Sequence, residues 1–476
     1  MSSFDFSNFF IYKYRYIIGY VLIGLTLIFS LVFSSLYLPG GLTEKEIEST
    51  VTASVIDIKT PDSVNVINLP YYLLQKAGFK LFGVSLITIK LPSIILGAAS
   101  IVGLFLLLKK WFRARIAILS SLIAIATGQF LFIAQNGSPD IMYLFWPVWL
   151  MYFSSMISSE EKRKNIHIIL FGILASLSLY TPLSIYVLLV FGISTVVHPH
   201  LRFYLIKKMP KRKLITGLVI SAILITPLIY YVIKTPDIIL TILGIPKQLP
   251  DLGLNFSKLY NQYLSFSKPG GTTVITPFFE LGSFLIILIG IYRLIITRST
   301  AKSYTLAFWI FILAPIVVLN PDYISISFLP LVILLASGLN WLLNRWYGLF
   351  PRNPYARIAG LIPVVVLVST LIFFGATRYI FNYRYNPNIV NNFSKDIQLI
   401  PRDTKNILVA KDEFDFYNSM AKYNNDFKVI QEPTGENFVA TKKASNNFEN
   451  YNITRIITNS FKEDSDRFYL YTKTVN

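Results

Sequence analysis

The chain has 476 residues, of which 54% are hydrophobic and 14% are charged, and its formal net charge is +19. Long uncharged stretches such as 16–43, 116–139 and 358–377 recur along it, and a bilayer core is crossed by about 20 apolar residues in a helix. The composition therefore excludes a soluble multidomain protein and predicts a polytopic membrane protein. The absence of cysteine excludes disulfides, thiolate metal sites and cysteine nucleophiles.

Taken in chain order, the apolar stretches predict about eleven transmembrane helices. The first, 16–38, is expected to be retained, since no signal-peptide pattern precedes it. The stretch between Asn165 and Leu201 is divided into two short helices at Tyr180-Thr181-Pro182, because basic clusters on both sides require an even number of crossings. These two short helices are 167–180 and 183–197. The remaining predicted spans are 85–108, 116–134, 141–157, 214–233, 279–296, 305–321, 324–344 and 358–380.

This arrangement places the N-terminus in the cytoplasm and the C-terminus outside a prokaryotic plasma membrane. Nearly all the excess positive charge then lies on the cytoplasmic side, where anionic lipid headgroups attract it. The high pI is thus explained by topology, and no nucleic-acid partner is expected. Two long loops, about 39–84 and 234–279, are predicted to face outward.

The polar tail, 382–476, is predicted to form a small extracytoplasmic α/β domain after an all-α membrane domain over 1–381. Its pattern indicates a helix at 413–423. Short strands are predicted at 406–410, 427–431, 455–458 and 467–472.

The first outer loop carries three carboxylates, Glu44, Glu46 and Glu48, close to the membrane surface. Thr43-x-x-Glu46 is typical of a capping box, in which Glu46 only serves the start of a helix. Glu44 and Glu48 would share one helical face while Glu46 points elsewhere, so the three cannot all serve one site. Both a structural and a catalytic interpretation remain open on spacing alone.

Two further segments carry isolated charges on the outer side. After an amphipathic helix ending at Gly83, expected to lie on the membrane, Lys90 stands at the outer end of the second span. Lys90 either snorkels to the interface or offers a cation to a phosphate. Ser138-Pro139-Asp140 is typical of a helix start, although Asp140 is also an acid on the same side as Glu44.

A metal site has few candidate ligands on the outer side. His167, His198 and His200 all fall on the predicted cytoplasmic side. An outer metal would therefore need carboxylates and water, which suits Mg²⁺, Mn²⁺ or Ca²⁺ and not Zn²⁺. No metal ligand is assigned, and no phosphate-binding loop, dinucleotide fingerprint or Ser-His-Asp set is found.

The order of these segments resembles the GT-C superfamily of membrane glycosyltransferases. The acidic loop after the first span leads into Gly78-Phe79-Lys80-Leu81-Phe82-Gly83, then Lys90-Leu91-Pro92-Ser93, and then the acidic turn at Asp140. The resemblance is specific over 35–155. It is closest to the bacterial branch similar to protein O-mannosyltransferases and lipid A aminoarabinose transferases.

The resemblance implies that a sugar moves from a polyprenyl-phosphate carrier in the membrane to an extracytoplasmic protein or glycan, with inversion at the anomeric carbon. Members carry an Asp-Glu pair in the first outer loop. Aligned on Pro39-Gly40-Gly41-Leu42, this pair falls on Lys45-Glu46, so Glu44 is the nearest substitute for the aspartate. Asp140 matches the acid of the second outer loop, where Gln135 or Asn136 replaces the usual arginine.

These matches give the expected site. Glu44 or Glu46 is the base and Asp140 orients the acceptor or the base. Lys90 and Lys59 contact the donor phosphate, and Gln135, Asn136 and Tyr71 contact the sugar or acceptor. The lipid-linked sugar is a co-substrate, and the one cofactor considered is a divalent Mg²⁺ or Mn²⁺ ion.

Two alternatives belong to other classes. A transporter or flippase of lipid-linked sugars is disfavoured, because the predicted spans are nearly free of ionisable residues and no inverted repeat is evident. A catalytically degenerate scaffold that binds polyprenyl lipid is favoured by one residue, Lys45, at the position where an aspartate is expected.

Overall fold

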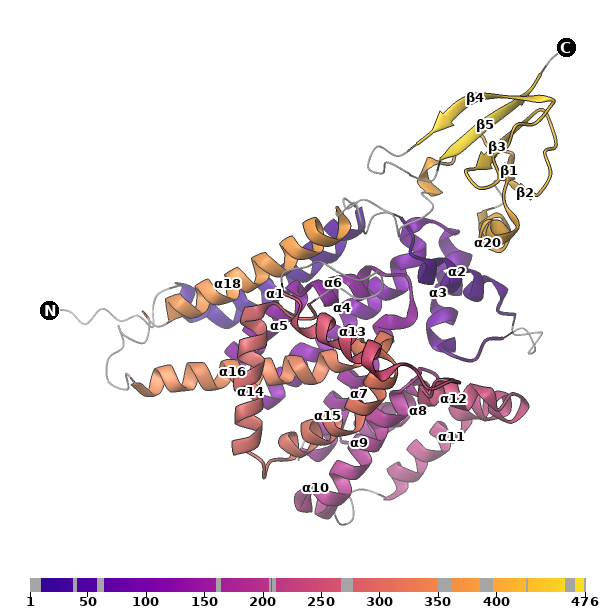
Figure 1. Cartoon of the computed structure of the whole chain (residues 1–476). Coiled ribbons are helices and arrows are strands. Elements are labelled where there is room, and N and C mark those ends of the chain that lie inside the picture. The colour runs from indigo at the N-terminus through magenta and orange to yellow at the C-terminus, as the bar shows by residue number, and fades with distance from the viewer. Residues whose placement is uncertain are drawn as a thin grey trace. The chain divides into compact units, whose positions relative to one another are not determined.

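A computed structural model describes residues 10–36, 41–57, 64–159, 164–204, 207, 211–266, 277–349, 359, 361–385, 397–424, 427–458 and 467–474. The chain divides into two compact units. The helical unit comprises Met1–Phe33, Leu96–Phe132 and Asp140–Tyr379, and the mixed unit comprises Ser34–Ile95, Ile133–Pro139 and Ile380–Asn476. Figure 1 shows the helices of the former and the strands of the latter.

Most helices of the helical unit are apolar, as the uncharged stretches predict. Helix α4 begins in the mixed unit and ends in the helical unit. Helix α6 begins in the helical unit and ends in the mixed unit. The helices are α1 (Phe10–Leu36), α4 (Leu86–Trp111), α5 (Ala114–Ala126), α6 (Gly128–Gln135), α7 (Met142–Ser158), α8 (Lys164–Ser178), α9 (Ser184–Val197), α10 (Pro199–Phe203), α11 (Lys211–Lys234), α12 (Asp237–Leu243), α13 (Leu252–Leu264), α14 (Leu281–Ile296), α15 (Ala301–Leu319), α16 (Phe328–Leu349) and α18 (Leu361–Thr377).

The predicted spans coincide with helices in the described residues, except that 116–134 corresponds to two helices, α5 and α6. Among the described residues, six helices are long and apolar enough to cross a membrane, and a seventh span results if α5 and α6, bent by 63°, are counted together. The four others are shorter apolar helices, and α8 and α9 are separated at the predicted turn. That the chain crosses the membrane about eleven times stays a prediction.

Helices α14 and α16 approach each other closely, and Figure 1 shows them crossing. A Cβ atom at Gly290 would collide with the main-chain oxygen of Leu334, and one at Gly338 with that of Ile286. Small residues allow membrane helices to pack backbone to backbone. An ion pair between Glu280 and Arg378, with an N–O distance of 3.2 Å, also connects the start of α14 with the end of α18.

The mixed unit contains α2 (Glu44–Val55), α3 (Leu69–Phe82), the first residues of α4 and a five-stranded sheet. The sheet order is β2-β1-β3-β5-β4, in which β1 pairs parallel with β2 and β3, and β5 pairs antiparallel with β3 and β4. The elements are β1 (Asn406–Leu408), α20 (Phe414–Asn424), β2 (Lys428–Ile430), β3 (Asn437–Thr441), β4 (Tyr451–Ile457) and β5 (Phe468–Lys473).

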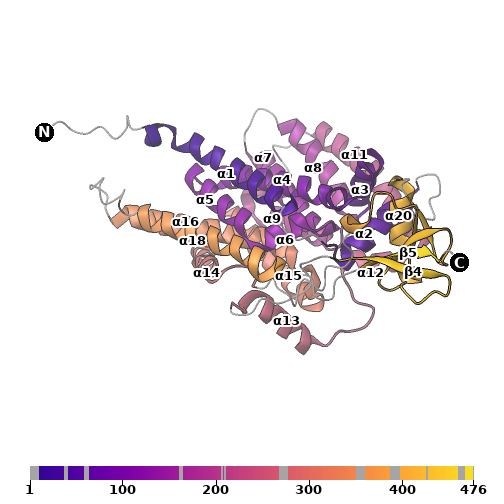
Figure 2. The ribbon, with the colours of Figure 1, turned by 90° about the horizontal axis from the view of Figure 1, so that it is seen from above.

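The predicted helix and all four predicted strands of the tail are present, and β3 is an additional strand. β3 is the strand with four consecutive buried residues, and Phe438 in it stacks on Tyr471 of β5 at a ring distance of 5.0 Å. Helix α20 packs against both strand β2 and helix α2, and both views show α20 and α2 side by side (Figure 1, Figure 2). The predicted boundary between domains at residue 381 stays a prediction, and 386–396 lies outside the described residues.

Candidate functional site

Helix α2 begins with the predicted capping box. The Thr43 hydroxyl accepts a hydrogen bond from the Glu46 main-chain N–H at 3.3 Å, and Glu46 Oε2 accepts one from the Thr43 N–H at 2.7 Å. This exchange satisfies two amides that a helix start leaves without partners. It also fixes the Glu46 side chain against the N-terminal end of its own helix.

The carboxylate of Glu46 forms a buried ion pair with Lys90, which lies near the start of α4. Glu46 is 1% exposed and Lys90 is 5% exposed, and the distance from Lys90 Nζ to Glu46 Oε1 is 3.4 Å. The ammonium also donates to the Gly41 carbonyl at 3.4 Å. A buried charge is costly unless it is paired and hydrogen-bonded, so each of these two residues depends on the other.

A turn between α6 and α7 completes this arrangement. The Gly137 N–H donates to Glu46 Oε1 at 2.7 Å. Asn136 accepts a hydrogen bond from the Thr43 hydroxyl at 3.0 Å and donates to the Ser138 hydroxyl at 2.9 Å. We call Thr43, Glu46, Lys90, Asn136 and Gly137 the Glu46 cluster. A Cβ atom at Gly137 would lie 2.7 Å from the main-chain oxygen of Ile89, so the close approach of turn and helix requires glycine.

Helix α3 supplies a polar residue that the sequence interpretation missed. Gln75, fully buried, donates to the carbonyls of Ile89 and Gly137 at 3.1 and 3.3 Å and accepts a hydrogen bond from Ser49 at 2.8 Å. Its amide thereby connects α2, α3, α4 and the turn. In the sequence, Gln75 is only a polar residue on a short amphipathic helix. That pattern does not distinguish a buried glutamine from one exposed to solvent.

Tyr71 also lies inside the mixed unit and does not reach solvent. Its ring is fully buried, and its hydroxyl lies 2.8 Å from that of Ser93. Ser93, the last residue of the Lys90-Leu-Pro-Ser segment, donates in turn to the Ser138 carbonyl at 3.2 Å. Ser93 therefore contacts the same turn, between α6 and α7, that contributes Asn136 and Gly137 to the Glu46 cluster.

The other predicted site residues are not in the Glu46 cluster. Glu44 is exposed in the first turn of α2, and Gln135 is buried at the end of α6. Asp140 is half-buried in a short 3₁₀ helix, Pro139–Ile141, and belongs to the helical unit. Lys59 lies outside the described residues.

The C-terminal end of α2 is surrounded by cations. Lys76 donates to the carbonyl of Ile56, and Lys422 donates to that of Ser54 at 3.1 Å. Burial lowers the pKa of Lys76, the nearby Lys80 and Lys422 lower it further, and Asp57 opposes these effects. Cations near a helix C-terminus stabilise the helix through its dipole and its unpaired carbonyls.

A bound divalent metal ion stays a prediction. Within them, no three histidine, aspartate or glutamate side chains come together. Both oxygens of Glu46 already accept hydrogen bonds at 2.7 Å. The cation that the structure places at Glu46 is the ammonium of Lys90.

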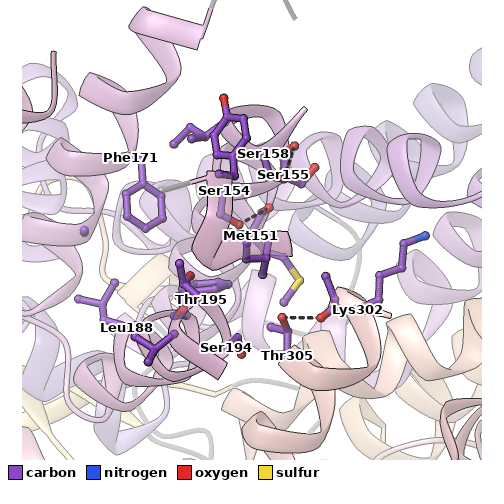
Figure 3. A pocket seen from close by; sticks show the side chains of 18 of the residues that line it. Met151, Ser154, Ser155, Ser158, Phe171, Leu188, Ser194, Thr195, Lys302 and Thr305 are labelled. Carbon is purple, nitrogen blue, oxygen red and sulfur yellow. Dashed lines mark hydrogen bonds between the residues drawn. The ribbon is translucent and has the colours of Figure 1, made fainter. Parts of the chain in front are cut away.

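A cavity of about 720 Å³ lies within the helical unit, between α7, α8, α9 and α15 (Figure 3). Its wall is mainly apolar and carries hydroxyls on α7, α9 and α15. Of the predicted site residues that the structure describes, none lines this cavity. The labelled lining residues are Met151, Ser154, Ser155, Ser158, Phe171, Leu188, Ser194, Thr195, Lys302 and Thr305.

Comparisons with known proteins agree with the expected superfamily. The sequence model of the dolichyl-phosphate-mannose-protein mannosyltransferase family matches residues 69–231, a range that contains Lys90, Asn136 and Asp140 and begins after α2. No curated protein matches the chain. Together with the solved structures described next, this family match confirms the predicted resemblance to the GT-C superfamily.

Solved structures with this fold include ArnT from Cupriavidus metallidurans in the apo state, with 12% sequence identity and a TM-score of 0.56, over 96% of this chain and 98% of that chain. The same protein bound to undecaprenyl phosphate matches equally well, with a TM-score of 0.56. The oligosaccharyltransferase of Archaeoglobus fulgidus, tethered to an acceptor peptide containing an NVT sequon, has 13% identity and a TM-score of 0.52 over 87% of this chain and 64% of that chain. At these identities the likeness is one of fold.

Proposed function

We propose that this chain, whose fold is that of the GT-C glycosyltransferases, transfers a sugar from a polyprenyl-phosphate donor to an acceptor outside the membrane. The observation that carries the proposal is the buried Glu46–Lys90 pair, in which a lysine is held among outer-loop segments of such a fold. A lysine is a compact cation suited to a phosphate. A lipid-linked phosphate stays at the membrane surface while its sugar reaches outward.

Lys90 would act on the departing phosphate. Two of its contacts, to Glu46 and to Gly41, measure 3.4 Å. A charge-assisted hydrogen bond from the ammonium to a phosphate oxygen would be shorter, about 2.7–2.9 Å. A cation placed where negative charge develops lowers the barrier to departure.

Glu44 is the carboxylate that we assign as the base. Its side chain is exposed, whereas Glu46 is buried and engaged at both oxygens, which suits a positioning residue for Lys90. The acceptor oxygen or nitrogen forms a bond to the anomeric carbon while the bond from that carbon to phosphate oxygen breaks. The acceptor proton passes to Glu44, and the displacement inverts the anomeric centre.

The remaining predicted residues are assigned by the resemblance. Asp140, near the start of α7, would orient the acceptor, and Lys59 would assist Lys90. Gln135 and Asn136 would contact the sugar or the acceptor. Tyr71 would act indirectly, since its hydroxyl contacts Ser93.

A second candidate function has one observation in its favour. Lys45 stands where the family places an aspartate, so the chain could bind polyprenyl phosphate as a scaffold without turnover. The two functions differ in a single measurable product, which is polyprenyl phosphate released from a sugar-loaded donor.

The test uses proteoliposomes containing the purified chain and radiolabelled polyprenyl-phosphate hexoses, with label transfer and lipid release both measured. Glu44→Gln should lower transfer by about 10²–10⁴-fold, the usual contribution of a general base. Glu48→Gln, which removes an exposed carboxylate one turn later in α2, is the matched control and should transfer normally. Full transfer by both Glu44→Gln and Asp140→Asn would refute this assignment, and donor binding without release would establish the scaffold.

A further inference from the structure

We propose that the C-terminal domain positions the Glu46 cluster, through helix α20, and that Asn424 is its main positioning residue. The contacts that carry this inference all lie within the mixed unit. The inference rests on the proposed function for its consequences on transfer. The contacts themselves are tested separately.

Asn424, the last residue of α20, pairs with the main chain between α3 and α4. Its Oδ1 accepts a hydrogen bond from the Val84 N–H at 2.6 Å, and its Nδ2 donates to the Val84 carbonyl at 2.9 Å. One side-chain amide thus satisfies both main-chain groups of the same residue, as a neighbouring strand would do. Val84 lies two residues before the start of α4, the helix that carries Lys90.

The residue before Val84 is shaped for this contact. Gly83 has a φ of +71°, a conformation that favours glycine. A Cβ atom there would also lie 2.6 Å from Asn424 Oδ1. The glycine that ends α3 therefore both allows the turn of the backbone and leaves room for the asparagine.

Helix α20 also contacts the far end of α2. The hydroxyls of Ser419 and Ser54 lie 2.6 Å apart, and both residues are buried. Lys422 donates to the Ser54 carbonyl at 3.1 Å, one of the carbonyls that the helix end leaves without an intrahelical partner. The ring of Tyr423 packs on Phe79 of α3 with their centroids 5.8 Å apart.

These contacts fix the two segments that carry the ion pair. Glu46 is at the N-terminal end of α2 and Ser54 is at its C-terminal end, and Lys90 follows Val84 in the next helix. Because a helix moves nearly as a rigid rod, holding Ser54 and Val84 limits how far Glu46 and Lys90 can separate. A displacement of about 1 Å at a reacting group can cost about 10²-fold in rate.

The experiment compares Asn424→Ala with Asn418→Ala, because Asn418 is an exposed asparagine of the same helix. Hydrogen exchange of the amides of Thr43, Glu46 and Gly137 is measured first, since it needs no substrate. We expect faster exchange in Asn424→Ala and unchanged exchange in Asn418→Ala. Unchanged exchange in Asn424→Ala would overturn the inference, whether or not the protein is a transferase.

Activity and rescue form the second arm. Asn424→Ala should lower kcat for transfer by about 10–10²-fold, and Asn418→Ala should not. The chain has no cysteine, so Ser54→Cys with Ser419→Cys supplies a single disulfide between α2 and α20. Oxidation of this pair should return kcat of the Asn424→Ala protein to within about threefold of the wild type. Failure of the disulfide to form, or failure of the formed disulfide to restore kcat, would overturn the positioning role.

The two proposals fail in different ways. If the wild type transfers no sugar but exchange at Thr43, Glu46 and Gly137 still depends on Asn424, the proposed function is wrong and the positioning contact stands. If transfer is normal in Asn424→Ala and exchange is unchanged, the proposed function stands and the positioning contact does not.

Discussion

At the residue scale, Glu46 and Lys90 stabilise each other in a place that solvent hardly reaches. Removing one member of a buried pair leaves the other charge without compensation, which typically costs about 3–5 kcal/mol. Replacing both members by neutral groups removes that penalty. The relation between single and double variants therefore reports whether the pair exists as the structure shows it.

We expect Glu46→Gln and Lys90→Met each to lower the free energy of unfolding by about 3 kcal/mol. The double variant Glu46→Gln/Lys90→Met should lose less than either single variant. Thermal unfolding in detergent, followed by intrinsic fluorescence, measures all three proteins, and Glu44→Gln serves as a control on the same helix. Additive losses in the double variant would show that the two charges do not interact.

Local spacing predicts only part of this site. The Thr43–Glu46 capping box is confirmed, because its two partners are three residues apart. The contacts of Glu46 with Gly137 and of Thr43 with Asn136 join residues 91 and 93 positions apart. No periodicity encodes such pairings, so Gln75 and Gly137 were missed and the environment of Glu46 was not foreseen.

At the element scale, the contact of α14 with α16 depends on two glycines. Gly338→Ala would place a Cβ atom against the main-chain oxygen of Ile286, which no side-chain rotation relieves. We expect it to lower stability by roughly 1–3 kcal/mol, the usual cost of overpacking. Gly348→Ala lies in the same helix with nothing within 4 Å of its Cβ.

The same thermal unfolding assay compares these two glycine variants. Gly348→Ala should leave stability unchanged or raise it by up to about 1 kcal/mol, because alanine favours a helix. Equal melting temperatures for Gly338→Ala and Gly348→Ala would show that the two helices do not approach as described.

Element prediction succeeded for the long apolar runs and for four short strands, and it missed one strand, β3. Runs of about 20 apolar residues predict a helix with little ambiguity. The predicted spans coincide with helices in the described residues, although 116–134 is divided into α5 and α6. Strand β3 is only five residues long and follows a glycine turn. It was missed because its strand character depends on burial between β1 and β5. Neighbouring strands supply that burial, and a single sequence does not show them.

At the scale of the whole molecule, the predicted orientation is testable because the chain has no cysteine. Single cysteines at Arg202, exposed in α10, and at Glu449, exposed in the tail, mark the two predicted sides. A membrane-impermeant maleimide should label Glu449→Cys in intact cells and Arg202→Cys only after permeabilisation. The reverse labelling pattern would show that the topology is opposite to the predicted one. The Glu46 cluster would then lie on the side of the membrane away from the proposed acceptor.

In the proposed function, Lys90 binds the phosphate of a polyprenyl lipid. The most direct test is equilibrium binding of polyprenyl phosphate to nanodisc-embedded wild type, Lys90→Met and Lys80→Met, since Lys80 is an exposed lysine on α3. Loss of one charge-assisted hydrogen bond, about 1.5–3 kcal/mol, should weaken binding to Lys90→Met by about 10–10²-fold, with Lys80→Met unchanged. Wild-type affinity in Lys90→Met would contradict the account.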